Sequence, residues 1–374
     1  MMHSLKHIYR LGVKELWGLY RDWVLLLLIV YSFTLSIYTA ATAMPDGLSN
    51  AAVAFIDEDD SPLSKRIMSA FYPPMFIPPI EVSLENVDRG MDKDLYTFTV
   101  DIPPNFQRDV LYGRSPDIQL NVDATRMSQA FVGAGYIQNI TMQEIQEFVK
   151  RYRAVETPPV DLVVRNRFNP NLTQSWFGGV MEIINQVTML SIILTGAALI
   201  REREHGTLEH LLVMPVTPTE IMLSKIWSMG LVVLLATGMS LFLIVYHAIG
   251  VPRQGSPWLF LAGAAVHLFA TTSMGIFLAT LARSMPQFGM LILLVLLPMQ
   301  MLSGGSTPRE SMPEAVQWIM MAAPTTHFVQ IGQAILYRGA GFAVVWKYFV
   351  SLFIIGLVLF TISHAQFRKS VNQG

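Results

Sequence analysis

The sequence contains no cysteine in its 374 residues, few charged residues and almost no net charge. Without cysteine, a disulfide scaffold, a thiolate metal site and a thiol nucleophile are excluded. Charged residues make up 14% of the chain, compared with about 25% in ordinary soluble domains. A formal net charge of −1 implies no basic face for nucleic acid. Glycine is nowhere followed by lysine, so the G-x-x-x-x-G-K loop that binds nucleotide phosphates is missing as well.

Hydrophobic residues, by contrast, make up 52% of the chain, and the mean hydropathy is +0.43. They gather into apolar runs, and a run of about 20 residues is long enough to cross a bilayer as a helix. We predict six transmembrane helices, of which the fifth is the shortest and contains Pro298. The predicted spans are 23–43, then near 176–200, 226–249, 258–281, 288–302 and 342–363.

The first run raises the question of a cleaved leader, because Ala41-Thr42-Ala43 resembles a signal-peptidase site. The apolar region of a leader is usually about 7–15 residues long, and this run is longer, which favours a membrane anchor. Residues 1–22, before the run, are predicted to form an amphipathic helix at the membrane interface. Its apolar positions are Leu5, Ile8, Tyr9, Gly12, Leu16, Leu19 and Tyr20. The alternative is an ordinary charged leader segment.

Lysine and arginine near the ends of the runs predict the orientation. Most of them fall on one side of a chain that crosses six times, and the positive-inside rule places that side in the cytoplasm. Both termini are therefore expected in the cytoplasm, and residues 44–175 are expected outside it. The cytoplasmic set is Lys6, Arg10, Lys14, Arg21, Arg201, Arg203, Lys225, Arg283, Arg368 and Lys369.

Residues 44–175 are predicted to form a small folded α/β domain. Ala52–Ile56 and Asp117–Asp123 have the composition of short strands, and Ser61-Pro62 is typical of a helix start. A longer helical pattern runs from Met127 to Arg153, whereas Phe71–Ile80 contains four prolines and is expected to be a loop. The predicted fold class is thus an all-α polytopic membrane protein with six transmembrane helices and an inserted α/β extracytoplasmic domain. The remainder, 176–374, comprises the other five helices, a connection at 201–225 and an outer segment at 303–341.

The connection at 201–225 has the most definite local pattern in the chain. A mixed-charge cluster leads into a short amphipathic stretch that ends near Pro215. Thr217, Pro218 and Glu220 then match a capping box with proline at the first helical position, which starts the next crossing. We therefore expect a short helix held between two membrane helices by tight turns.

This connection resembles the signature of the type-2 ABC (ATP-binding cassette) exporter permeases, which is close to E-R-E-x-G-T-x-E-x-L-x-x-x-P-V-x-P. The matching residues are Glu202, Arg203, Glu204, Gly206, Thr207, Glu209, Leu211, Pro215, Val216 and Pro218. The outer segment that begins at Leu302 also resembles this family, and Val53–Asp59 and Ile102–Phe106 resemble its drug-exporter-like branch with a large external domain. One departure is Gly305-Ser306-Thr307, where many relatives carry bulky apolar residues.

The resemblance implies a permease subunit of the bacterial inner membrane that exports a substrate without catalytic, metal or cofactor-binding residues of its own. A separate ABC ATPase subunit would bind and hydrolyse ATP, a second permease copy or a related permease would complete the path, and a periplasmic membrane-fusion adaptor is a further possible partner. The substrate stays open. The residues assigned to coupling with the ATPase are Glu202, Glu204, Gly206, Thr207, Leu208, Glu209, Leu211, Leu212 and Pro215.

Three polar residues of the second predicted crossing share one helical face. Glu182, Asn185 and Gln186 are spaced at i, i+3 and i+4. Lipid cannot satisfy polar groups, so these residues are expected to line the path or to contact another helix, with placement near the membrane interface as the alternative. His267, alone in the middle of its helix, is expected to pack inside the bundle.

Two further sequence patterns and two alternative functions compete with this interpretation. His205 and His210 are five residues apart, about 140° around a helix, so they do not share a face as zinc-binding histidines do. Leu302–Ser306 imitates an ATPase signature motif, but no phosphate loop accompanies it. A secondary transporter is the main alternative, although the chain has no inverted repeat and few intramembrane charges. An intramembrane hydrolase would need a nucleophile and base that no motif supplies.

Overall fold

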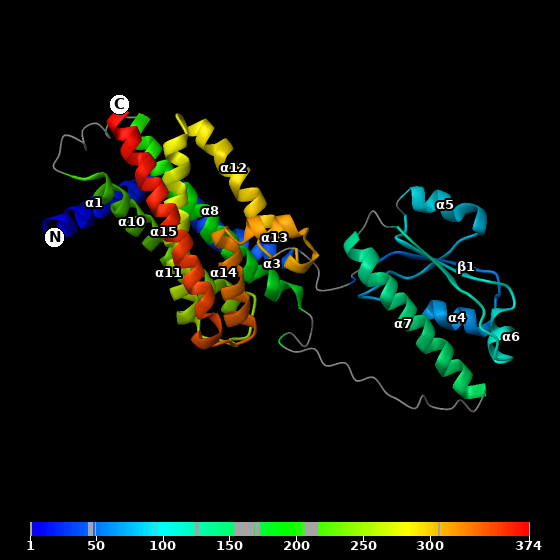
Figure 1. Ribbon diagram of the computed structural model, residues 1–374. Coiled ribbons are helices and arrows are strands. Elements are labelled where there is room, and N and C mark those ends of the chain that lie inside the picture. Colours follow the sequence, from blue (N-terminus) through cyan, green and yellow to red (C-terminus); the bar gives the residue numbers. More distant parts are fainter. Residues whose placement is uncertain are drawn as a thin grey trace. The chain divides into compact units, whose positions relative to one another are not determined.

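The computed structural model describes residues 2–43, 48, 50–93, 95–123, 127–152, 168, 173–204, 206, 216–305 and 307–373. Contacts between Cα atoms divide the chain into two compact units, which are described separately (Figure 1). The first unit comprises Met1–Met44, Arg167–Asn169 and Ser175–Gly374. The second comprises Pro45–Asn166 and Pro170–Gln174.

The first unit is helical. Within the described part of the chain, five helices are long and apolar enough to cross a membrane, and Met285–Met301 is a shorter apolar helix. The predicted polytopic helical fold is therefore confirmed. Its helices are α1 (Met2–Arg21), α2 (Trp23–Tyr31), η1 (Ser32–Ser36), α3 (Ile37–Thr42), α8 (Gln174–Glu204), α10 (Pro218–Ser240), η2 (Leu241–Ala248), α11 (Pro257–Leu281), α12 (Met285–Met301), η3 (Arg309–Ser311), α13 (Glu314–Met320), α14 (Pro324–Gly332), η4 (Gln333–Tyr337) and α15 (Phe342–Gln373).

Helix α8 supplies much of the buried core of this bundle. Its Ile183, Val187 and Leu190 are fully buried against residues of the neighbouring helices. Polar side chains inside the bundle are joined across helices, as in the 2.9 Å contact between Thr188 Oγ1 and His267 Nε2. Such hydrogen bonds are the usual means of satisfying polar groups where lipid offers none. His267 lies fully buried among the helices, as the sequence predicts.

The second unit is built on a four-stranded sheet with the order β2-β1-β3-β4. Strand β1 pairs in parallel with both β2 and β3, whereas β4 is antiparallel to β3. The strands are β1 (Val53–Asp57), β2 (Ile80–Glu81), β3 (Phe98–Ile102) and β4 (Gln119–Val122). The helices are α4 (Pro62–Ser69), α5 (Leu84–Asp92), α6 (Phe106–Leu111) and α7 (Met127–Tyr152).

Helices cover both faces of this sheet (Figure 1). Successive side chains of a strand point to opposite faces. In β1, Phe55 packs in the core that includes residues of α4, α6 and α7, whereas Ile56 packs in a smaller core with Val87 of α5. Helix α4 begins where the sequence predicts, because the Ser61 hydroxyl accepts a hydrogen bond from the Ser64 backbone N–H, 3.1 Å away. The predicted small α/β fold is therefore present in this unit.

Candidate functional site

The candidate site is the connection between α8 and α10 together with the helix ends that flank it. Helix α8 extends through Glu204 and α10 begins at Pro218, so the stretch between the two helices is shorter than the predicted 201–225. The predicted capping box is formed: Glu220 N–H donates to Thr217 Oγ1 over 3.3 Å, and Thr217 N–H donates to Glu220 Oε2 over 2.7 Å. These bonds satisfy backbone donors that a helix start leaves unpaired.

Only part of the predicted coupling set lies in the described chain. Gly206 has φ +69°, in the left-handed region that glycine adopts without steric cost, so the chain can turn sharply as it leaves α8. Glu202 and Glu204 lie in the last turn of α8. The remaining predicted coupling residues are Thr207, Leu208, Glu209, Leu211, Leu212 and Pro215; they lie outside the described residues, as do His205 and His210.

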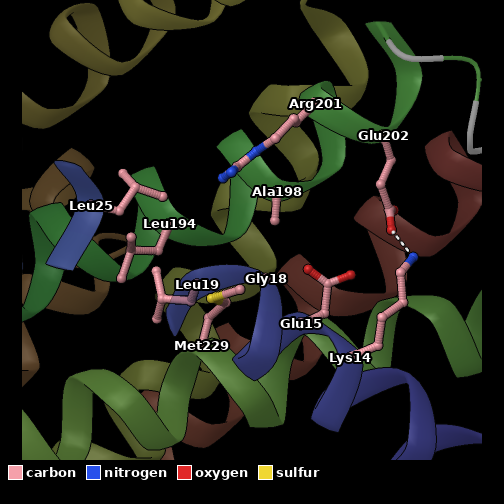
Figure 2. Close-up of a pocket in the computed structure, with 10 residues that line it drawn as sticks. All are labelled: Lys14, Glu15, Gly18, Leu19, Leu25, Leu194, Ala198, Arg201, Glu202 and Met229. Atoms are coloured by element: carbon pink, nitrogen blue, oxygen red, sulfur yellow. Dashed lines mark hydrogen bonds and ion pairs between the residues drawn. The ribbon is translucent and has the colours of Figure 1, made fainter. Parts of the chain in front are cut away.

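Four charged side chains join the C-terminal end of α8 to α1 and α10. The Lys225 ammonium lies 2.7 Å from Glu202 Oε2 and 2.8 Å from Glu15 Oε1, and Lys14 Nζ lies 3.2 Å from Glu202 Oε1. We call Lys14, Glu15, Glu202 and Lys225 the ion-pair cluster. Figure 2 shows Lys14 and Glu202 facing each other, with Glu15 beside them. The cluster ties three helices together at one point.

Three of the four members of the ion-pair cluster are largely removed from water, whereas the side chain of Lys14 is 55% exposed. The side chain of Lys225 is 1% exposed, that of Glu202 11% and that of Glu15 13%. Burial raises the pKa of Glu15 above its ordinary value; Lys225 acts against this rise, and the nearby Glu202 carboxylate adds to it. Both buried carboxylates contact the Lys225 ammonium, and these contacts offset part of the cost of removing the charges from water.

Further contacts attach the end of α8 to its other neighbours. Arg201 Nη1 donates to Asp22 Oδ2 over 2.9 Å, at the start of α2. Arg203 donates to the carbonyl oxygen of Ala282, 2.8 Å away, just after α11. Glu204 Oε1 accepts a hydrogen bond from the Met285 backbone N–H at the start of α12. Together with the ion-pair cluster, these contacts would transmit a movement of the α8 end to five other helices: α1, α2, α10, α11 and α12.

A cavity of about 270 Å³ lies beside the ion-pair cluster, between α1, α2, α8 and α10 (Figure 2). Lys14, Glu15 and Glu202 lie on one side of it, and the apolar side chains, toward which Arg201 points, lie on the other. Its lining consists of Lys14, Glu15, Gly18, Leu19, Leu25, Leu194, Ala198, Arg201, Glu202 and Met229.

Trp227 of α10 makes several of the contacts through which α1 packs along α10. Trp227 Nε1 donates to the carbonyl oxygen of Ile8 over 3.1 Å, and its ring is parallel to that of Tyr9, with centroids 6.0 Å apart. A Cβ atom at Gly12 would lie 2.2 Å from the Trp227 ring, so glycine is what permits this approach. Trp17 and Tyr20 point outward and are exposed, which fits the predicted interfacial placement of this helix.

The structure brings the three polar residues of α8 together, and adds a fourth. Gln186 Nε2 donates to Glu182 Oε1 over 2.6 Å and to Ser36 Oγ of η1 over 3.0 Å. Ser36 Oγ–H also donates to Glu182 Oε1, and Asn185 Nδ2 lies 3.5 Å from Glu182 Oε2. We call Ser36, Glu182, Asn185 and Gln186 the polar cluster. It joins the first predicted crossing to the second.

Sequence reasoning missed Ser36, Glu15 and Lys225 as site residues. Lys225 did carry a signal, because it is the one basic residue of α10, a long apolar helix in which an ionisable residue usually has a nearby partner. Glu15 carried no such signal. Its partner is 210 residues away in the sequence, and only the fold brings them into contact.

Known proteins resemble the chain over nearly its whole length. Residues 23–364 match the family described as "ABC-2 family transporter protein". The chain is 61% identical over 371 residues to the "Inner membrane transport permease YhhJ" of Escherichia coli K12, with 99% of each chain covered. It is 26% identical over 374 residues to the "Probable multidrug ABC transporter permease YbhR" of E. coli K12, with 99% of this chain and 100% of the relative covered. The "Probable multidrug ABC transporter permease YbhS" is 27% identical over 260 residues, which cover 68% of this chain and 67% of the relative.

Proposed function

The chain belongs to the ABC-2 family of transporter proteins and is the membrane permease subunit of an ABC transporter, and we propose that it exports its substrate from the cytoplasm. It is a multi-pass protein of the inner membrane and a transport subunit rather than a catalytic enzyme. Family membership favours this function over the secondary transporter and the intramembrane hydrolase. It also implies that an ABC ATPase is the partner.

The source of energy is proposed to be a separate ATPase subunit. In support, the chain has no G-x-x-x-x-G-K loop of its own. We assign the contact with that subunit to the connection between α8 and α10, through Leu208, Leu211 and Leu212 as an apolar face and Glu209 as a charged one. Under this assignment, ATP is bound by the ATPase subunit and not by the permease.

One observation carries the coupling mechanism: the helix ends on both sides of the connection are tied together. Lys225, near the start of α10, pairs with Glu202, near the end of α8, and both pair with residues of α1. A displacement of the connection by the ATPase would therefore move α8, α10 and α1 as one piece. Glu202 then holds the end of α8 against α1 and α10, because its nearly buried carboxylate pairs with Lys14 and Lys225.

The coupling assignment is tested with Leu211→Asp and Glu209→Lys in the permease reconstituted with its ATPase. Both variants should insert and assemble normally but lose ATPase association or uncouple hydrolysis from transport. Truncating an interface anchor typically costs about 2 kcal/mol or more, roughly a thirtyfold loss of affinity. Glu310→Lys, a charge reversal in the exposed η3 helix, is the matched control and should behave as wild type. Full association and full transport in both test variants would refute the assignment.

We propose further that two permeases form the path, either two copies of this chain or one copy with a related permease. The half-buried Glu182 and Asn185 of the polar cluster would face the path or the second permease. Native mass measurement should find two permeases for each pair of ATPase subunits, and a single permease in that complex would refute the proposal.

A periplasmic membrane-fusion adaptor is a proposed additional partner, tested by co-purification from the native membrane.

A further inference from the structure

Helix α8 leaves one narrow stripe of its surface uncovered. From residue 181 to residue 200, all of its side chains are buried except four, which are half-buried. These four are Glu182, Asn185, Met189 and Ile193. They follow one another at intervals of three or four residues and therefore lie on one face of the helix. Lipid cannot satisfy polar side chains, so a stripe with a carboxylate and an amide faces a cavity or another protein.

Glu182 lies within the membrane and not at its surface. The apolar span of α8 begins at Ser175, about 10 Å before Glu182 along the helix axis. Ser36, which donates a hydrogen bond to Glu182, lies about 9 Å before Thr42, where the first span ends. Both helices thus place the carboxylate at a similar depth. The other acidic residues of the described spans lie at helix ends; they are Glu202, Glu204 and Glu220.

The Glu182 carboxylate has hydrogen-bond donors but no opposite charge. Its Oε1 accepts from Ser36 Oγ over 3.2 Å and from Gln186 Nε2 over 2.6 Å. Its Oε2 has only the 3.5 Å contact with Asn185 Nδ2. A carboxyl group that only accepts hydrogen bonds is in its ionised form. No basic side chain in the described part of the chain pairs with it. Charged groups inside a membrane usually have a partner of opposite charge, so the missing partner is a cation.

The polar atoms that the stripe leaves free are hydrogen-bond acceptors. The Asn185 amide nitrogen is directed at Glu182, and its carbonyl oxygen accepts no hydrogen bond from the described residues. Glu182 Oε2 is the second acceptor. A protonated amine matches both, because it combines a positive charge with N–H donors. Further along the same stripe, the half-buried Met189 and Ile193 add an apolar surface.

We propose that the exported substrate is an amphiphilic amine and that Glu182 binds its protonated amino group. The amino group donates hydrogen bonds to Glu182 Oε2 and to the Asn185 carbonyl oxygen, while the apolar body of the substrate lies along Met189 and Ile193. Apolar burial provides the affinity, and Glu182 selects the charge. This inference rests on the proposed function, because it takes the stripe to face the export path.

Binding is measured with the full-length permease in nanodiscs of zwitterionic lipid, without nucleotide or ATPase, and the signal of empty nanodiscs is subtracted. Three fluorescent probes share a naphthylhexyl body and carry a protonated primary amine, a hydroxyl group or a sulfonate. The amine should bind most tightly. Glu182→Gln keeps the shape of the side chain and should weaken binding of the amine by about tenfold or more, while leaving the alcohol unchanged. Glu310→Gln, the same change at an exposed position of η3, is the control.

The apolar contact is tested with Met189→Ala. This variant should weaken the amine and the alcohol alike, by up to about fivefold, because both probes lose the same apolar surface. Leu235→Ala, at an exposed position of α10, is the control and should leave both unchanged.

A measurement on the wild type locates the amine without relying on any variant. Dicyclohexylcarbodiimide is an apolar reagent that modifies carboxyl groups within membranes. The amine should protect Glu182 from this modification, as followed by mass spectrometry, whereas the alcohol should not. Modification of Glu182 that the amine leaves unchanged would overturn the proposal.

Equal binding of the three probes, or binding of the amine that is insensitive to Glu182→Gln, would also overturn it. If Glu182→Gln retained binding of the amine but lost the permease pair in native mass measurement, a basic residue of the second permease would be the partner of Glu182, and the proposal would again be wrong.

Transport separates this inference from the proposed function. Inverted vesicles that contain the complete transporter should take up the amine when ATP is added, and Glu182→Gln should reduce the uptake by about tenfold. If the vesicles took up the sulfonate in preference to the amine, export would stand and the assignment of the amine would fall. Binding of the amine at Glu182 without ATP-driven uptake of any probe would contradict export and, with it, the role of the amine as substrate.

Discussion

Lys225 is the residue on which the attachment of α1, α8 and α10 depends. Its side chain is 1% exposed, and its ammonium group contacts two carboxylates whose side chains are themselves nearly buried. Removing one member of a buried ion pair leaves charge that neither water nor protein compensates. The structural role of the ion-pair cluster can therefore be tested at this one position.

We expect Lys225→Met to destabilise the folded protein by about 3–5 kcal/mol. Thermal unfolding of the purified protein in detergent measures the effect, and Lys6→Met, at an exposed position, is the control. Adding Glu15→Gln and Glu202→Gln to Lys225→Met should restore part of the loss, because no buried charge is then left unpaired. An unchanged unfolding temperature for Lys225→Met would contradict the prediction.

Glu15 makes the stability of this junction dependent on pH. Because burial raises its pKa above the ordinary 4.5, the folded protein holds this proton more tightly than the unfolded chain does. Its contribution to stability is therefore complete below the unfolded pKa and is lost as the pH rises through the folded pKa. Glu15→Gln imitates the protonated carboxyl. The unfolding temperature of this variant relative to wild type should rise as the pH increases above the ordinary pKa of the Glu15 carboxyl. Parallel curves for the two proteins would contradict this.

At the scale of the element, α1 is held against α10 by close approach as well as by charge. The 2.2 Å distance from a Cβ at Gly12 to the Trp227 ring means that any larger residue must displace α1 or the ring. Gly18, two turns further along the same helix, has nothing within 4 Å of the equivalent position. Gly18 is therefore a suitable control position for a substitution at Gly12.

Gly12→Ala is expected to lower stability by about 1–3 kcal/mol through overpacking. Gly18→Ala should leave stability unchanged or raise it by up to about 1 kcal/mol, because alanine is the better helix former. Thermal unfolding of the two variants side by side provides the measurement. If both changed stability alike, helix propensity would explain the result and the contact with Trp227 would be unimportant.

For the molecule as a whole, the prediction concerns the side of the membrane on which the two termini and residues 44–175 lie. The bias in lysine and arginine predicts both termini in the cytoplasm and residues 44–175 outside. Alkaline phosphatase fused at Gly113 should be active, and green fluorescent protein fused after Gly374 should fluoresce. Each reporter exchanged to the other position should be silent. Activity of the same reporter at both positions would refute the topology.

Features that arise from neighbouring residues could be predicted from the sequence. Apolar run length predicted the membrane helices, and the helix over Met127–Tyr152 follows from its local pattern. The capping box of Thr217 and Glu220 was also predictable, because its partners are three residues apart. Local geometry fixes such contacts before any tertiary structure forms.

Contacts between residues distant in the chain could not be predicted in this way, because they depend on how whole elements pack. Two of the four strands, β2 and β3, were not predicted as strands: β2 is two residues long, and both gain their partners by pairing with β1. Ser36 meets Glu182 across 146 residues, and Glu15 meets Lys225 across 210. The core of the second unit likewise exists because residues of α4, α6 and α7 pack against Phe55 of β1. A pattern of nearby residues carries no information on such pairings, since packing of whole elements sets them.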